Sequence, residues 1–170
     1  DPLLDKGWIA ITDFYVRQEN YQKALFYVNK ALGIDNENRF YWKRYATINK
    51  EMNLLEEAEY GYKKAVEFGD IQLDTWLYWV DTLQFLGESE SAIKTLLQST
   101  EYFPESFEVE YRLAGLYFML GEDKKGKFHI SNALRLNGKN YLLLKELFPV
   151  AWNRRMVQNI IKKHLESGKF

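Results

Sequence analysis

The chain has 170 residues, of which 46% are hydrophobic and 28% charged, and its formal net charge is −1. This composition is typical of a folded domain and excludes the disordered and collagenous classes. The absence of cysteine excludes disulfide bonds, thiolate metal ligands and a cysteine nucleophile. Only three prolines occur, which favours an all-helical fold because proline interrupts helices.

The chain starts with Asp1-Pro2-Leu3. This start has no initiator methionine and lacks the basic and apolar regions of a signal peptide. No apolar run approaches the roughly 20 residues that a helix needs to cross a bilayer. We therefore expect a piece of a longer protein, with no membrane segment in this chain and with a cytoplasmic location.

A 34-residue period organises residues 5–140. Tryptophan recurs at this interval, at Trp8, Trp42 and Trp76. Small residues recur in the same register, at Ala24, Ala58, Ala92 and Gly126, and again at Ala31, Ala65, Ser99 and Ala133. A fixed period of this length is typical of repeat architectures. The predicted units are 5–38, 39–72, 73–106 and 107–140.

Each unit predicts two helices. In the third unit, apolar residues lie on one helical face at i, i+3, i+4 and i+7, namely Trp76, Trp79, Val80 and Leu83. Gly87 then ends this helix, as Gly121 does in the fourth unit. The small residues fall on the second helices, where they allow neighbouring helices to approach closely. One helix pair cannot bury its own apolar face, so stacked pairs form a continuous core.

Residues 141–170 leave this register. Tyr141 to Phe148 predicts a short helix, which Pro149 ends. Residues 150–166 predict an amphipathic helix with Met156, Ile160 and other apolar side chains on one face. Since a terminal repeat needs a polar outer side, we interpret 141–170 as a C-terminal cap. No equivalent segment precedes Trp8, which leaves the first helix uncapped unless further repeats or a partner cover it.

The repeated pattern resembles the tetratricopeptide repeat, whose unit carries Trp, Leu, Gly and Tyr on a first helix and Ala, Phe, Ala and Pro on a second. The second unit has the following residues at those positions: Trp42, Tyr45, Ala46, Asn49, Ala58, Tyr62, Ala65 and Asp70. The resemblance implies an all-α fold, a right-handed α-solenoid of four helix-turn-helix units plus the capping segment, in a single domain. The Leu-Phe-Pro tail also resembles the ends of long bacterial arrays, so we expect the C-terminal part of such an array.

The resemblance implies a protein–protein interaction scaffold rather than an enzyme, with no catalytic, cofactor or metal residues. In this family the first helices line a concave groove that binds a peptide or a partner helix. The groove positions carried over to this chain are Lys43, Arg44, Thr47, Lys50, Tyr78, Asp81, Tyr111, Arg112, Gly115 and Phe118. Aromatic rings there supply contact area, and charges set the register of the bound segment.

Two alternatives remain open. Paired aromatics such as Trp76 and Trp79 also resemble the half-a-TPR repeats of RNA-processing scaffolds. That variant expects Glu late in its first helix and Arg early in its second, where this chain has Leu83 and Ile93 in the third unit. The chain is not basic overall, so no nucleic acid is expected as a partner. The second alternative is self-association through the uncapped first helix, or between the acidic third unit, of net charge −5, and the basic tail, of net charge +4.

Two patterns suggest chemistry and are interpreted structurally. Residues 121–128 approach the phosphate-loop motif, but Phe128 stands where a hydroxyl would hold Mg²⁺, and a helix precedes the motif instead of a strand. The histidines, His129 and His164, lie on different predicted helices with no further ligand nearby.

Overall fold

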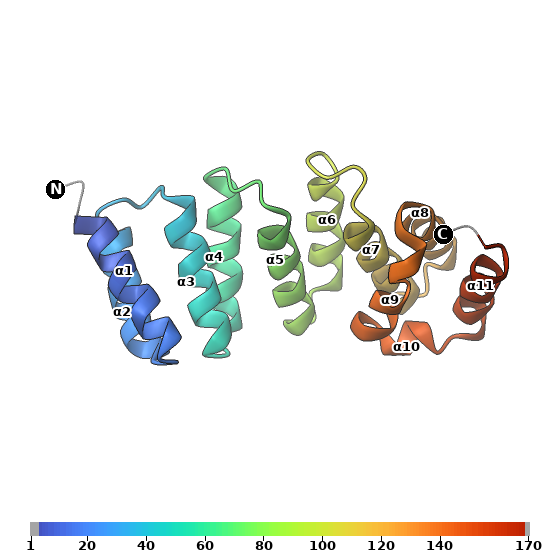
Figure 1. Ribbon diagram of the computed structural model, residues 1–170, viewed down its shortest axis with the longest axis horizontal. Helices are drawn as coiled ribbons and strands as arrows, with labels where there is room; N and C mark the ends of the chain where they lie inside the picture. Colours follow the sequence, from blue (N-terminus) through green and yellow to red (C-terminus); the bar gives the residue numbers. More distant parts are fainter. Residues whose placement is uncertain (1–3, 169–170) are drawn as a thin grey trace. The chain divides into compact units, whose positions relative to one another are not determined.

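The computed structural model describes residues 4–168, and these residues form helices and no strand, as predicted (Figure 1). The first eight helices are α1 (Leu4–Arg17), α2 (Tyr21–Leu32), α3 (Arg39–Glu51), α4 (Leu55–Glu67), α5 (Leu73–Phe85), α6 (Ser89–Ser99), α7 (Phe107–Met119) and α8 (Asp123–Asn137). The 3₁₀ turn η1 (Gly138–Asn140) and three helices follow: α9 (Leu142–Leu147), α10 (Pro149–Trp152) and α11 (Arg155–Glu166). Each predicted 34-residue unit holds two α-helices, although α1 begins one residue before the first unit.

The turn between the two helices of each repeat has one recurring backbone conformation. Glu19, Asn53, Gly87 and Gly121 lie 34 residues apart, and each has a positive φ, between 54° and 79°. The next residue in each turn donates its backbone N–H to a carbonyl five residues earlier, at 2.9 Å in all four repeats. This left-handed residue and its hydrogen bond form a Schellman motif, which ends the first helix.

The recurring small residues hold the helices together. Ala24, Ala58, Ala92, Ala31, Ala65, Ser99 and Ala133 are all fully buried. Gly126 lies against Phe118, since a β-carbon at 126 would lie 2.5 Å from the Cδ1 atom of that ring. Residues 121–128 are therefore a turn followed by a close helix–helix contact, and not a phosphate-binding loop.

The structure divides into two compact units, one ending at Ala92 and the other beginning at Ile93, so the boundary falls inside α6. In the first unit α1 packs on α2, α2 on α3, α3 on α4 and α4 on α5. Figure 1 shows the members of the pairs α1/α2 and α3/α4 side by side. Trp79 donates its indole N–H to Glu59 at 2.9 Å, which ties α5 to α4.

In the second unit α7 packs on α8, and both α9 and α10 pack on α7. Phe148 joins α9 to α10 and is 96% buried. Arg154 follows α10; it donates to the carbonyl oxygen of Phe118 at 2.8 Å and forms an ion pair with Asp123 at 2.7 Å. The part of the predicted cap that forms α9 and α10 therefore lies on α7. None of the described helices is both long and apolar enough to span a bilayer.

Candidate partner-binding face

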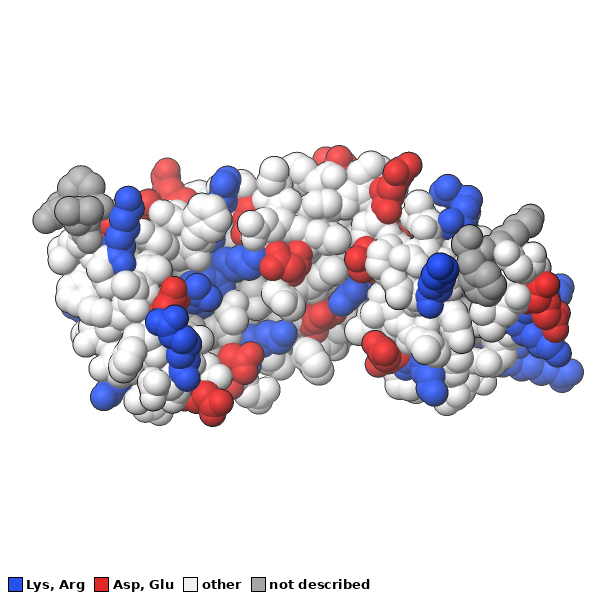
Figure 2. Space-filling view, viewed as in Figure 1, with Lys and Arg blue, Asp and Glu red and all other residues white. Residues whose placement is uncertain are grey.

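Three first helices of the first unit, α1, α3 and α5, are joined by polar contacts. Arg44 on α3 forms an ion pair with Asp13 on α1, with 2.9 Å between Nε and Oδ1. Lys43 on α3 forms an ion pair with Asp74 on α5 at 2.8 Å. We call the surface formed by Asp13, Lys43, Arg44, Thr47, Lys50, Tyr78 and Asp81 the first-helix face. Figure 2 shows acidic and basic side chains interspersed over this unit.

Lys43 and Arg44 have different roles on this face. The Lys43 side chain is only 19% exposed, and its Nζ atom contacts both Asp74 and the side-chain oxygen of Gln72. Lys43 therefore links α3 to α5 and to the residue that precedes α5. The Arg44 side chain is 41% exposed and uses only its Nε atom on Asp13 within residues 4–168. Its remaining guanidinium N–H groups are available to a carboxylate or carbonyl of a partner.

Tyr78 is the exposed aromatic ring of the first-helix face. It is 40% exposed, and its ring centroid lies 6.1 Å from that of Tyr62 and 4.8 Å from Nζ of Lys50. Burial raises the pKa of Tyr62 to about 12, so its hydroxyl stays neutral beside the Thr47 hydroxyl, 3.5 Å away. Tyr78 is thus held on a fixed support, which lowers the entropy cost of using it as a contact.

The fourth repeat differs from the sequence-based expectation. Tyr111, Arg112 and Phe118 are at least 93% buried and are not accessible to a partner in this structure. Gly115 lies directly under the ring of Phe148, which a β-carbon at 115 would overlap. The chain's own C-terminal segment covers Gly115 and contacts Phe118 through Arg154, and the Tyr111 hydroxyl donates to the carbonyl oxygen of Asn137 at 3.1 Å. Asp81 remains half-buried on the first-helix face.

The two histidines are packing residues in different places. His129 is 91% buried, accepts or donates a 2.8 Å hydrogen bond with Glu110, and stacks on Tyr117 with 5.3 Å between ring centroids. His164 lies on α11 against the backbone of Gly138. Among the described residues no three His, Cys, Asp or Glu side chains gather as a metal site.

Comparison with known proteins identifies the repeat. Residues 6–38 match the tetratricopeptide repeat model, which describes a single repeat, and the same helix pair with the same Schellman turn recurs three more times. The chain is a tetratricopeptide-repeat protein. Proteins built from this repeat are typically scaffolds without catalytic activity, and the fold generally mediates protein–protein interaction.

Solved structures with the same fold include two tetratricopeptide proteins. The crystal structure of the MamA protein superposes with a TM-score of 0.80 at 14% identity, over 98% of this chain and 90% of that chain. YrrB, a tetratricopeptide protein with an unusual peptide-binding site, superposes with a TM-score of 0.70 at 14% identity, over 94% of this chain and 84% of that one. At these identities the likeness shows the fold alone.

One curated relative is a pre-mRNA-splicing factor, CLF1 of Candida glabrata. It is 26% identical over 88 residues, which are 52% of this chain and 12% of that protein. The chain therefore spans about an eighth of the length of this relative.

Sequence reasoning missed two features of the site. The first is the ion pairing of Lys43 and Arg44, which pattern alone does not reveal because it depends on side-chain direction. The second is the covering of α7 by Phe148. A signal for it existed, since a glycine at the groove position 115 leaves room for a ring, and the Leu-Phe-Pro segment supplies one.

Proposed function

We propose that this chain is a protein-interaction scaffold that carries out no catalysis and binds an extended peptide or a partner helix on the first-helix face. The observation that supports this most is Tyr78, an exposed ring that is supported by the Tyr62 ring and has Nζ of Lys50 4.8 Å from its centroid. Aromatic and arginine side chains dominate the binding energy of protein interfaces. The ion pairs with Asp13 and Asp74 fix the charges in advance, which favours a partner of defined charge pattern.

The bound segment spans the second and third repeats in this proposal. Tyr78 covers an apolar side chain of the partner, and the free guanidinium N–H groups of Arg44 bind a carboxylate or carbonyl. The groove positions of the fourth repeat take no part, because Tyr111, Arg112 and Phe118 are buried and Phe148 covers Gly115. The interaction takes place in the cytoplasm, which fractionation of cells carrying the tagged protein tests.

The test is affinity capture of the tagged protein from its own cells, with Tyr78→Ala as the variant. The matched control is Tyr60→Ala. Tyr60 is 48% exposed, similar to Tyr78, but lies on α4, the second helix of its repeat, and so outside the first-helix face. We expect Tyr78→Ala to reduce the captured partner by about tenfold, the effect of losing an interface hot spot. Equal capture by both variants, with unchanged helical content, would contradict the proposal.

A second candidate function is an RNA-processing scaffold, which the similarity to the splicing factor supports. In this case the partner is a protein of an RNA-processing complex, or RNA itself. Direct RNA binding predicts an affinity that falls steeply with salt, because phosphate contacts release counterions. Titration of labelled single-stranded RNA at two salt concentrations distinguishes the two candidates.

A third candidate is self-association through α1. Leu4 and Phe14 on this helix are 48% and 52% exposed. Sedimentation velocity over a range of concentrations tests this, and Phe14→Glu is expected to shift the protein to the monomer if α1 forms the contact.

A further inference from the structure

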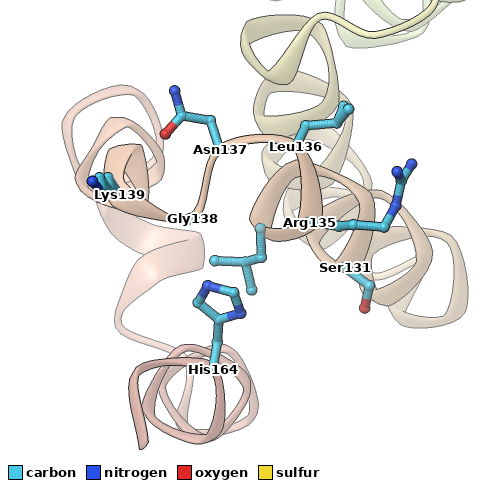
Figure 3. A pocket seen from close by; sticks show the side chains of 8 residues that line it. Ser131, Arg135, Leu136, Asn137, Gly138, Lys139 and His164 are labelled. Atoms are coloured by element: carbon cyan, nitrogen blue, oxygen red, sulfur yellow. The ribbon is translucent and has the colours of Figure 1, made fainter. Parts of the chain in front are cut away.

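The second unit has a seam between α8 and α11 along which two cavities lie. The larger has a volume of about 510 Å³ and is lined by Lys127, Arg155, Met156, Asn159, Ile160 and Lys163. The other, of about 420 Å³, is lined by the end of α8, by η1 and by His164 (Figure 3). On both helices the residues that line the larger cavity precede those that line the smaller one, so the two cavities follow each other along the seam between α8 and α11. We call the larger cavity the cationic pocket.

The cationic pocket carries positive charge that no acidic side chain of residues 4–168 pairs with. None of its described lining residues is acidic. Lys127, Arg155 and Lys163 are exposed and form no ion pair within residues 4–168. Three other cations near the pocket are paired: Lys125 with Glu122, Arg154 with Asp123 and Lys162 with Glu166. Figure 2 shows Lys and Arg gathered at the end of this unit that α11 forms.

The pocket also has an apolar floor. Met156 and Ile160 lie one turn apart on α11 and are half-buried. Val157 and Ile161 beside them are at least 97% buried and hold α11 on the unit. Since α11 is fixed by these buried residues, Met156 and Ile160 present a rigid apolar surface between cations.

The smaller cavity is lined by two cations, Arg135 at the end of α8 and Lys139 in η1, together with His164. In Figure 3 His164 points from α11 toward α8, while Arg135 and Asn137 point away from it. His164 also contacts the backbone of Gly138 directly. This contact joins α11 to the turn that follows α8 at that end of the seam, and we place the binding site in the cationic pocket.

We propose that the cationic pocket binds an acidic polypeptide segment through one apolar side chain and its flanking carboxylates. The apolar side chain packs on Met156 and Ile160, and the carboxylates pair with Lys127, Arg155 and Lys163. Three unpaired cations around an apolar floor are complementary to that pattern. This site lies wholly in the second unit and does not depend on the first-helix face.

Two other classes of anionic partner fit less well. A single-stranded nucleic acid uses aromatic rings as stacking platforms, and no aromatic residue is among the described residues that line the pocket. A membrane surface requires the apolar face of an amphipathic helix to be free for insertion, whereas Val157 and Ile161 are packed inside the unit.

The test uses the full chain and fluorescein-labelled short peptides in which glutamates alternate around a central leucine, followed by fluorescence anisotropy. We expect saturable binding that weakens with added salt. A peptide with glutamine in place of glutamate, or with serine in place of leucine, is expected to bind about tenfold more weakly or not at all.

The pocket variant combines Lys127→Glu, Arg155→Glu and Lys163→Glu. Its matched control reverses three exposed lysines outside the pocket by the same charge, at Lys124, Lys145 and Lys162. We expect the pocket variant to bind at least about tenfold more weakly and the control to change by less than about twofold. Circular dichroism confirms that both fold, and Met156→Ser provides a variant without any charge change, with the same expected loss.

Three results would overturn the proposal. The first is the absence of saturable binding by every acidic peptide. The second is an equal loss in the pocket variant and its control, which indicates general charge attraction only. The third is tighter pocket-dependent binding of single-stranded RNA or anionic vesicles than of the peptides, since this assigns the pocket to another class of partner.

Discussion

Replacing Phe148 by alanine tests how the C-terminal segment holds the second unit together. The ring is 96% buried and lies on Gly115, which has no side chain of its own to fill the space that the ring leaves. Removing a buried phenylalanine ring costs about 3–5 kcal/mol, from lost burial and from the cavity left behind. Repeat proteins unfold in part, so this loss falls on α7, α9 and α10 before it reaches the first unit.

Hydrogen exchange measured by mass spectrometry separates the two units. A loss of 3–5 kcal/mol accelerates exchange through local opening by about a hundredfold to several thousandfold. We expect this in peptides from α7, α9 and α10, with unchanged protection in α3 and α4. Phe128→Ala is the control, because Phe128 belongs to the same unit and is 62% exposed. Unchanged protection of α7 in Phe148→Ala would refute the packing role of this ring.

Three further predictions concern stability. Glu19 has a φ of 54°, so Glu19→Gly is expected to raise the free energy of unfolding by about 1 kcal/mol in urea titrations; no change would show that the turn is unstrained. Gly61→Ala places a β-carbon 2.9 Å from that of Ala46 and is expected to lower the free energy of unfolding by about 1–3 kcal/mol. Gly7→Ala adds a β-carbon with no atom within 4 Å and is expected to raise the free energy of unfolding by about 0.5–1 kcal/mol. Equal melting temperatures of the two variants would contradict this. Burial raises the pKa of Tyr41, Tyr62 and Tyr111 to about 12. The folded chain therefore keeps protons that the unfolded chain loses above pH 10, so the free energy of unfolding falls between pH 10 and 12. Absorbance at alkaline pH is expected to show that these three tyrosines ionise later than free tyrosine.

The repeat could be predicted from the sequence because its signal is one of spacing. Ala24, Ala58 and their equivalents mark the close helix contacts, and Gly87 and Gly121 mark turns that need a positive φ. The same turn at Glu19 and Asn53 carried a weaker signal, since these residues adopt that conformation only when the surrounding structure requires it.

The site was harder to predict than the repeat. Carry-over of groove positions selects residues of the first helices, and the structure has Lys43, Arg44, Thr47 and Lys50 on α3 and Tyr78 and Asp81 on α5. It did not anticipate that Phe148 covers Gly115, since this contact joins segments that no period relates. The ion pairs of Arg44 with Asp13 and of Lys43 with Asp74 also link residues 31 apart in sequence, where side-chain direction and not spacing decides which atoms meet.

The most direct measurement is site-specific photocrosslinking in the protein's own cells, with a photoreactive phenylalanine at position 78 or at position 60. A partner that binds the first-helix face is expected to crosslink at position 78 and not at position 60. Crosslinks of the same partner at position 60 alone, or at both positions with equal yield, would contradict binding on this face.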